Sequence, residues 1–72
     1  MHIYELQSTA KGQSTGERLI DVSFPKTSIV VAIERKGDVF APNPGQAIEA
    51  GDTMYIIGPP DIEKQLEKMF IG

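Results

Sequence analysis

The sequence predicts a two-layer α+β domain in which a mainly antiparallel sheet packs against a C-terminal amphipathic helix. Several segments rich in β-branched and aromatic residues are separated by turns that contain glycine or proline, which is typical of strands joined by hairpins. The C-terminal segment instead repeats its apolar residues with the period of a helix. We therefore expect the order β-α-β-β-β-α, with a short helix after the first strand.

The length of the chain predicts one domain that spans residues 1–72 and depends on a partner. A chain of 72 residues buries only about 60% of its unfolded surface when it folds. The sequence has no cysteine, which excludes disulfides and thiolate metal sites. Because small domains without such cross-links often complete their core against another chain, we expect self-association.

Charge and hydropathy exclude two classes of partner. The net charge is −3, and the lysines and arginines form no basic run, so we expect no nucleic-acid partner. The longest apolar run, residues 29–33, is far shorter than the roughly 20 residues that cross a bilayer. The N-terminus also lacks the cationic start and apolar core of a signal peptide. The chain is expected to be soluble and unexported, with no direct membrane insertion.

The first two elements are a strand and a helical turn. Residues 3–7 begin with β-prone side chains and lead into a polar stretch, which predicts a short strand and a flexible connection. After this stretch, Ser14 or Thr15 can cap the backbone N–H groups of a single helical turn. In that turn, Leu19 and Ile20 are expected to point inward.

A second strand, at residues 28–35, follows the break at Pro25. Period-two alternation places Ile29, Val31 and Ile33 on one face and Val30, Ala32 and Glu34 on the other. Because both faces are largely apolar, we expect a helix to cover one side of the strand and another layer, such as a second subunit, to cover the other.

The next elements complete the predicted sheet. Residues 36–38 have the composition of a turn, so residues 39–41 are expected to run back alongside the second strand. The prolines and glycine of residues 42–45 predict an irregular loop. A turn at Gly51 and Asp52 then introduces the last strand, at residues 53–58.

The C-terminal helix is expected to begin near the two prolines at 59 and 60, with Asp61 placed to complement the helix dipole. Its apolar residues stand at positions i, i+4, i+7 and i+8, and are Ile62, Leu66, Met69 and Phe70. This spacing gathers them into one stripe. The helix should therefore lie across the sheet.

Several short motifs follow one another in order along the chain. They are Gly16-x-x-Leu19-Ile20-Asp21, a strand that ends Ala32-Ile33-Glu34-Arg35, the Pro42-x-Pro44 loop, Ile48-x-x-Gly51-Asp52-x-Met54-x-Ile56-x-Gly58 and the amphipathic helix. This series covers roughly residues 5–71 and resembles the C-terminal domain (RCK-C, or TrkA-C) of regulators of potassium conductance and uptake. The resemblance implies a two-layer α+β homodimer on the cytoplasmic side of a channel or transporter.

The resemblance also implies a ligand site. Some relatives bind cyclic dinucleotides, notably cyclic di-AMP, in a cleft between two copies. Leu19, Ile20 and Pro42 match the cleft positions of that family, and Asn43 adjoins them. The cation that would pair with the phosphates is Lys26, or Arg35 if it faces the cleft. A plainer interpretation stays open, with the apolar pair in the core, the proline loop as a connector and Arg35 as a solvated charge.

The residues give no support for catalysis. His2 is the only histidine and lies at the terminus, so acyl transfer would have no base. Each aspartate has a simple use as a cap or turn residue, and no Gly-x-Gly-x-x-Gly opens a helix after a strand. We therefore expect a protein that is not an enzyme and has no cofactor. A small hydrolase that uses carboxylates is not motivated by any motif.

The leading hypothesis is a cytoplasmic regulatory domain, peripheral to the inner membrane through its channel or transporter partner. In it, a small anionic or nucleotide-like ligand shifts a homodimer between two arrangements. The alternative is a purely structural oligomerisation domain in which no ligand binds.

Overall fold

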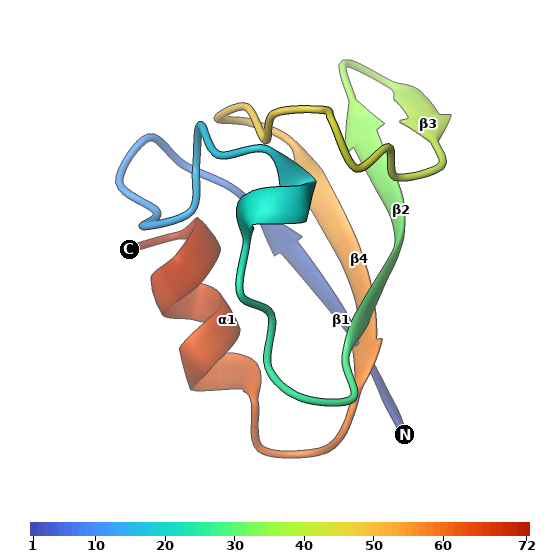
Figure 1. Cartoon of the computed structure of the whole chain (residues 1–72), viewed down its shortest axis with the longest axis vertical. Helices are drawn as coiled ribbons and strands as arrows, with labels where there is room; N and C mark the ends of the chain where they lie inside the picture. The colour runs from blue at the N-terminus through green and yellow to red at the C-terminus, as the bar shows by residue number, and fades with distance from the viewer.

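The computed structural model describes residues 1–72 as a four-stranded sheet with one α-helix. The elements are β1 (His2–Gln7), the 3₁₀ turn η1 (Leu19–Asp21), β2 (Ile29–Arg35), β3 (Asp38–Phe40), β4 (Thr53–Gly58) and α1 (Glu63–Phe70). The strands lie in the order β1-β4-β2-β3, and each neighbouring pair is antiparallel. α1 covers one face of the sheet (Figure 1). The predicted two-layer α+β fold is confirmed.

The core lies between this face of the sheet and α1. Its eleven buried apolar residues are Leu6, Leu19, Val30, Ile33, Ile48, Met54, Ile56, Ile62, Leu66, Met69 and Phe70. All four residues of the predicted helical stripe are among them, which confirms the orientation of the helix. With eight residues, α1 is far too short to span a bilayer, and it is the only α-helix.

The helix begins later than the sequence predicts. Asp61 has a φ of 70°, in the left-handed region, so it belongs to a turn and not to the first turn of α1. Ile62 occupies the N-cap position without a side-chain cap, and Glu63 is the acidic residue near the helix N-terminus. The two prolines therefore form a bend that precedes the helix.

The predicted helical turn after β1 is only the three-residue 3₁₀ turn η1, and its predicted cap is wrong. Arg18 occupies the N-cap position and makes no side-chain cap. The Thr15 hydroxyl instead donates a hydrogen bond of 2.7 Å to the carbonyl oxygen of Thr9. η1 ends at Val22, whose φ of −85° and ψ of 129° are extended, and the backbone N–H of Leu19, at its start, donates to the distant carbonyl of Gln46.

The strict alternation predicted for β2 is also wrong. A β-bulge between Val30 and Ala32 shifts the register of β2 against β4. Val30 and Ile33 are therefore both buried, although regular alternation would put them on opposite faces. Ile29 and Val31 are instead exposed, at 61% and 43%.

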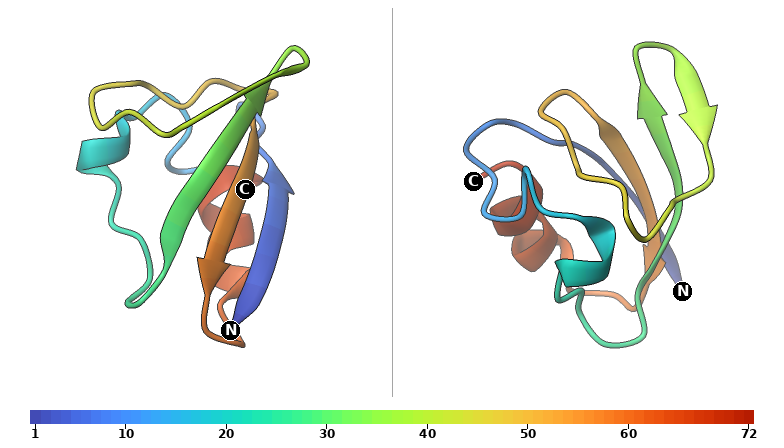
Figure 2. Two further views of the ribbon diagram at one scale, coloured as in Figure 1. Left: turned by 90° about the vertical axis from the view of Figure 1, so that its right-hand side faces the viewer. Right: turned by 45° about the horizontal axis from the view of Figure 1, so that its top comes forward.

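The outer face of the sheet, opposite α1, carries a row of isoleucines. Ile3 on β1 lies opposite Ile57 on β4, which in turn lies opposite Ile29 on β2. Figure 2 (left) looks onto this face, with α1 behind the strands. Ile3 is 74% exposed, so the chain leaves this row uncovered. The prediction that the sheet carries apolar residues on both sides is thus confirmed at this end.

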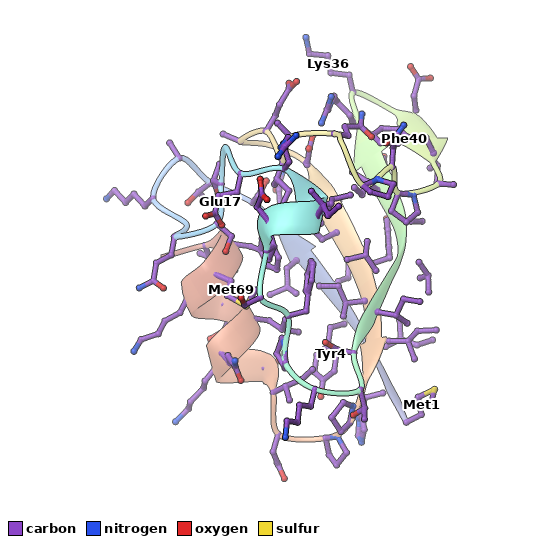
Figure 3. All side chains as sticks on the ribbon, in the orientation of Figure 1. Met1, Tyr4, Glu17, Lys36, Phe40 and Met69 are labelled. Atoms are coloured by element: carbon purple, nitrogen blue, oxygen red, sulfur yellow. The ribbon has the colours of Figure 1, made fainter.

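The hairpin between β2 and β3 leaves the N-terminal half of β2 without a strand on one of its two edges. Lys36 and Gly37 have φ values of 52° and 87°. Positive φ at both central residues is typical of the two-residue hairpin turn that favours glycine. Lys36 points away from the body of the molecule (Figure 3). β3 pairs with residues 33–35 of β2 alone, so residues 29–31 have no strand on the side away from β4.

Candidate functional site

An open groove of about 460 Å³ lies along the N-terminal half of β2. Its lining comes from η1, the segment before β2, β2 itself and the loop that joins β3 to β4, which we call the proline loop (residues 41–52). The lining residues are Leu19, Ile20, Phe24, Ser28, Ile29, Val30, Pro42 and Pro44. Only Ser28 carries a polar side chain, so the groove offers a mainly apolar surface to a ligand or another chain.

Backbone hydrogen bonds join η1 to the proline loop and make the two walls of the groove one unit. The N–H of Ile20 donates to the carbonyl of Pro44 at 2.9 Å, and that of Leu19 donates to the carbonyl of Gln46 at 3.0 Å. Arg18 and Ala47 form an isolated antiparallel bridge between the same segments. The walls can therefore move only together without breaking these bonds.

The two residues of the apolar pair differ in position. Leu19 is buried in the core at 9% exposure, as predicted. Ile20 is 66% exposed on the wall of the groove, so the prediction that it points inward is wrong. Its apolar surface is therefore available to a ligand or a second chain.

The structure brings three of the five predicted site residues together, namely Leu19, Ile20 and Pro42. Asn43 and Arg35 do not line the groove. The side-chain oxygen of Asn43 accepts a hydrogen bond of 3.0 Å from the N–H of Gly45, which stabilises the loop itself. The groove positions of five further residues were not predicted from the sequence; they are Phe24, Ser28, Ile29, Val30 and Pro44. Of these, Pro44 stood within the same proline motif as Pro42.

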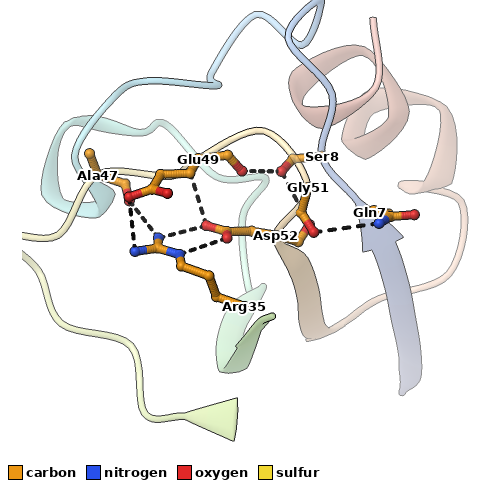
Figure 4. A network of polar contacts seen from close by, with 7 residues as sticks. All are labelled: Gln7, Ser8, Arg35, Ala47, Glu49, Gly51 and Asp52. Atoms are coloured by element: carbon orange, nitrogen blue, oxygen red, sulfur yellow. Dashed lines mark hydrogen bonds and ion pairs between the residues drawn. The ribbon is translucent and has the colours of Figure 1, made fainter. Parts of the chain in front are cut away.

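Arg35 is committed to the end of the proline loop. Its Nε and Nη2 donate to the two carboxylate oxygens of Asp52, each at 2.8 Å. Its Nη2 also donates to the carbonyl of Ala47 at 3.1 Å, and its Nη1 lies 3.0 Å from a carboxylate oxygen of Glu49 (Figure 4). The guanidinium lies over the ring of Phe40, 5.5 Å from its centroid. We call these contacts the Arg35–Asp52 clamp.

The clamp holds a buried charge. The side chain of Asp52 is 1% exposed, and this burial would raise the pKa of its carboxyl. The hydrogen bonds from Arg35 and from the N–H of Glu49 outweigh burial, so the pKa lies below its ordinary value. The pKa of Arg35 is raised, chiefly by the hydrogen bond to Asp52. Both groups therefore stay charged at neutral pH.

No charged side chain lines the groove itself. Lys26 is exposed and lies in the chain between two groove residues, Phe24 and Ser28. Arg18, next to η1, pairs with Asp21 at 3.1 Å, and both side chains are more than half exposed. Lys26 is therefore the cation nearest in sequence to the groove that has no acidic partner within ion-pair distance.

Comparisons with known proteins give one family and a consistent set of folds. The TrkA-C domain family model matches residues 9–71. No curated protein matches the chain.

Three solved structures share the fold. An RCK domain with cda is 20% identical, with a TM-score of 0.81, over 97% of this chain and 99% of that one. The RCK_C domain dimer of S. agalactiae BusR in complex with c-di-AMP is 23% identical, with a TM-score of 0.81, over 99% and 97%. S. agalactiae BusR in complex with its busAB-promotor DNA is 24% identical, with a TM-score of 0.75, over 96% of this chain and 35% of that one. At these identities the likeness shows the fold.

Proposed function

We propose that this chain, which belongs to the TrkA-C domain family, is a ligand-sensing and dimerising domain that regulates a channel or transporter of potassium or another ion. The observation that carries the proposal is the open apolar groove, in which the predicted residues Leu19, Ile20 and Pro42 come together. The domain acts by binding and not by catalysis, requires no cofactor, and works in the cytoplasm beside the inner membrane through its transport partner.

The second copy binds along the groove and the free edge of β2. Ile29 and Val31 are exposed there, and residues 29–31 have no strand beside them. An apolar edge without charges or prolines is a surface that pairs readily with another chain. A two-fold axis through this edge would set the two grooves against one another, as one self-complementary interface. The RCK_C domain of BusR, which shares this fold, is a dimer.

The ligand is a cyclic dinucleotide such as cyclic di-AMP, held between the two copies. The apolar walls pack against the flat faces of its bases, while Lys26 from each copy forms ion pairs with the phosphates. The BusR domain of the same fold was solved with c-di-AMP. A ligand that touches both copies favours the arrangement that it fits better, and this difference in affinity is what a transport partner can sense.

Nucleic acid is left out of the proposal. The net charge of the chain is −3 and no basic run exists, so the attraction that dominates binding to phosphate backbones is missing. The DNA complex of BusR involves a chain of which this domain matches 35%.

Replacing Ile20 with aspartate tests the proposal. Because Ile20 is 66% exposed, the fold should survive, but a carboxylate in the groove should lower the affinity for cyclic di-AMP at least about tenfold. Val39→Asp is the matched control, since Val39 is 65% exposed on β3 and does not line the groove. Calorimetric titration of the three proteins checks this. Unchanged affinity in Ile20→Asp, or an equal loss in Val39→Asp, would contradict the proposal.

A purely structural oligomerisation domain is the second candidate. It is favoured by the absence of charged side chains in the groove and by the commitment of Arg35 to Asp52. Thermal unfolding with cyclic dinucleotides, mononucleotides and phosphate separates the two functions. A ligand present at 100 times its dissociation constant should add about 2.7 kcal/mol of stability. A stable dimer that none of these compounds stabilises would favour the structural role.

A further inference from the structure

The groove walls are held against the sheet by two buried side chains, Leu19 of η1 and Ile48 of the proline loop, and by one polar anchor from β2. η1 and residues 44–47 of the proline loop bond to one another through the backbone. The end of the loop is held to the end of β1, where the N–H of Gly51 donates to Ser8 and the Ser8 hydroxyl donates to Glu49. Between these two regions, the guanidinium of Arg35 is the side chain that reaches from β2 to the carbonyl of Ala47.

Because Asp52 is buried, this anchor cannot be broken partially: Arg35 and Asp52 are either paired or both released. Every buried side-chain polar atom of the chain has a hydrogen-bond partner, and the two oxygens of Asp52 are satisfied by Arg35 and by the N–H of Glu49. A buried carboxylate that loses its cation must be exposed to water or neutralised. The loop therefore cannot lift away gradually, because releasing Arg35 also requires Asp52 to be solvated.

The chemistry of the contact requires arginine. The guanidinium donates two parallel bonds to one carboxylate and a third to Ala47, while the same group meets Glu49 and the ring of Phe40. Lysine would supply the charge as a single point and could not reproduce this planar fork. The end of β2 and the loop are thus joined in one fixed geometry.

We propose that Arg35 and Asp52 are positioning residues of the groove, which fix the proline loop against β2, and thereby against η1, without touching the ligand. The effect on ligand affinity rests on the function proposed above, whereas the effect on wall position does not. The clamp lies at the opposite end of β2 from Ile29. It therefore determines the position of the groove wall indirectly, through the proline loop that it holds.

Hydrogen exchange of single amides, followed by NMR, tests the positioning directly. Leu19 holds η1 in the core, so a proline loop that lifts away when the clamp is released breaks the bond from the N–H of Ile20 to Pro44. The N–H of Leu66, which donates to Ile62 within the first turn of α1, reports on the rest of the core. In Arg35→Gln, exchange at Ile20 should rise at least about tenfold more than exchange at Leu66. Arg35→Lys keeps the buried carboxylate paired and should give a smaller rise at the same amide.

Arg18→Gln is the matched control. It removes an arginine that also forms an ion pair, but with the exposed Asp21 beside η1. Its exchange at Ile20 should stay within about twofold of the unmodified protein. Equal increases at Ile20 and Leu66 in the Arg35 variants would show general loosening of the fold, and no increase would show that the walls hold without the clamp. Either result overturns the proposal.

Titration with cyclic di-AMP measures the effect of the clamp on ligand affinity. Folded Arg35→Gln should bind at least about tenfold more weakly, because the walls spend less time in the binding arrangement. Weaker binding with unchanged exchange at Ile20 would make Arg35 a direct ligand contact and would overturn the positioning role. If the unmodified chain does not bind cyclic di-AMP, the proposed ligand fails, and the exchange data alone still decide whether the clamp positions the walls.

Discussion

Replacing Asp52 with asparagine is expected to lower the free energy of unfolding by about 2–3 kcal/mol at neutral pH. The substitution keeps the shape of the side chain and removes only its charge and one of its acceptor oxygens. Asp52 accepts hydrogen bonds from Nε and Nη2 of Arg35 at 2.8 Å and from the N–H of Glu49 at 2.9 Å. In the variant, the amide NH₂ group faces a donor, so one of these bonds is replaced by a repulsive contact.

The magnitude follows from the unequal exposure of the two partners. Breaking a fully buried ion pair costs about 3–5 kcal/mol. The side chain of Arg35 is 23% exposed and keeps its contact with Glu49, so water and a second carboxylate offset part of this cost. A loss of about 2–3 kcal/mol corresponds to a fall in melting temperature of about 10–20 °C for a domain of this size.

Urea denaturation followed by circular dichroism measures the change, with Asp21→Asn as the control. Asp21 is 53% exposed in its pair with Arg18, so its substitution should change stability by no more than about 0.5 kcal/mol. A change for Asp52→Asn as small as that of the control would refute the view that the clamp is a stabilising contact.

The pH dependence gives an independent check on the same group. The pKa of Asp52 is lower in the folded chain than its ordinary value, so its charged form favours folding. The stability that it contributes is present above the ordinary carboxyl pKa of about 4 and is lost as the pH falls below it, through the folded value. The difference between the unmodified chain and Asp52→Asn should therefore be constant near neutral pH and shrink below about pH 4. A difference that persists unchanged in strong acid would refute this linkage.

Two further predictions concern the hairpin and the β2 edge. Gly37→Ala should destabilise the fold by about 1 kcal/mol, because Gly37 has a φ of 87° although nothing lies within 4 Å of an added Cβ; Gly45→Ala, at a residue without positive φ, should be near neutral in the same urea measurement. Ile29→Asp should shift the dimer toward monomer in light scattering, since Ile29 is exposed at the proposed interface, whereas Val39→Asp on β3 should leave the dimer intact. A monomer in both variants, or in neither, would contradict the assignment of the interface to the β2 edge.

The strands and α1 were predictable because each has a strong local pattern. The stripe from Ile62 to Phe70 has a helical period, and the turn at residues 36–38 predicts the pairing of β2 with β3. The pairing of β4 with β1 and β2 joins segments far apart in the sequence, and no local signal predicts it. The 3₁₀ turn was not predictable as such. Its first residues, Leu19 and Ile20, are held by hydrogen bonds to Gln46 and Pro44 in a distant loop, and no local signal reports on these bonds.

The candidate site also has one part that the sequence predicts and one part that it does not. Leu19, Ile20 and Pro42 were placed together through the family resemblance, and the structure confirms that they are neighbours. From the sequence, Arg35 is a ligand contact only if it faces the cleft and is otherwise a solvated charge, because its partner Asp52 is 17 residues away and has the position of a turn residue after Gly51. Which carboxylate meets which guanidinium depends on strand pairing, and spacing alone does not determine it.

The β-bulge in β2 lets one strand contribute to the core and still carry the exposed edge at which we place the second copy. Regular alternation would turn either Val30 or Ile33 away from the core. The extra residue lets both side chains stay buried while Ile29 and Val31 turn outward beside the groove. Burial in the core and an apolar edge for a second copy are thereby reconciled within one seven-residue strand. The bulge therefore contributes to stability, since removing it would turn Val30 or Ile33 out of the core, while the exposed side chains of Ile29 and Val31 stay available to a second copy.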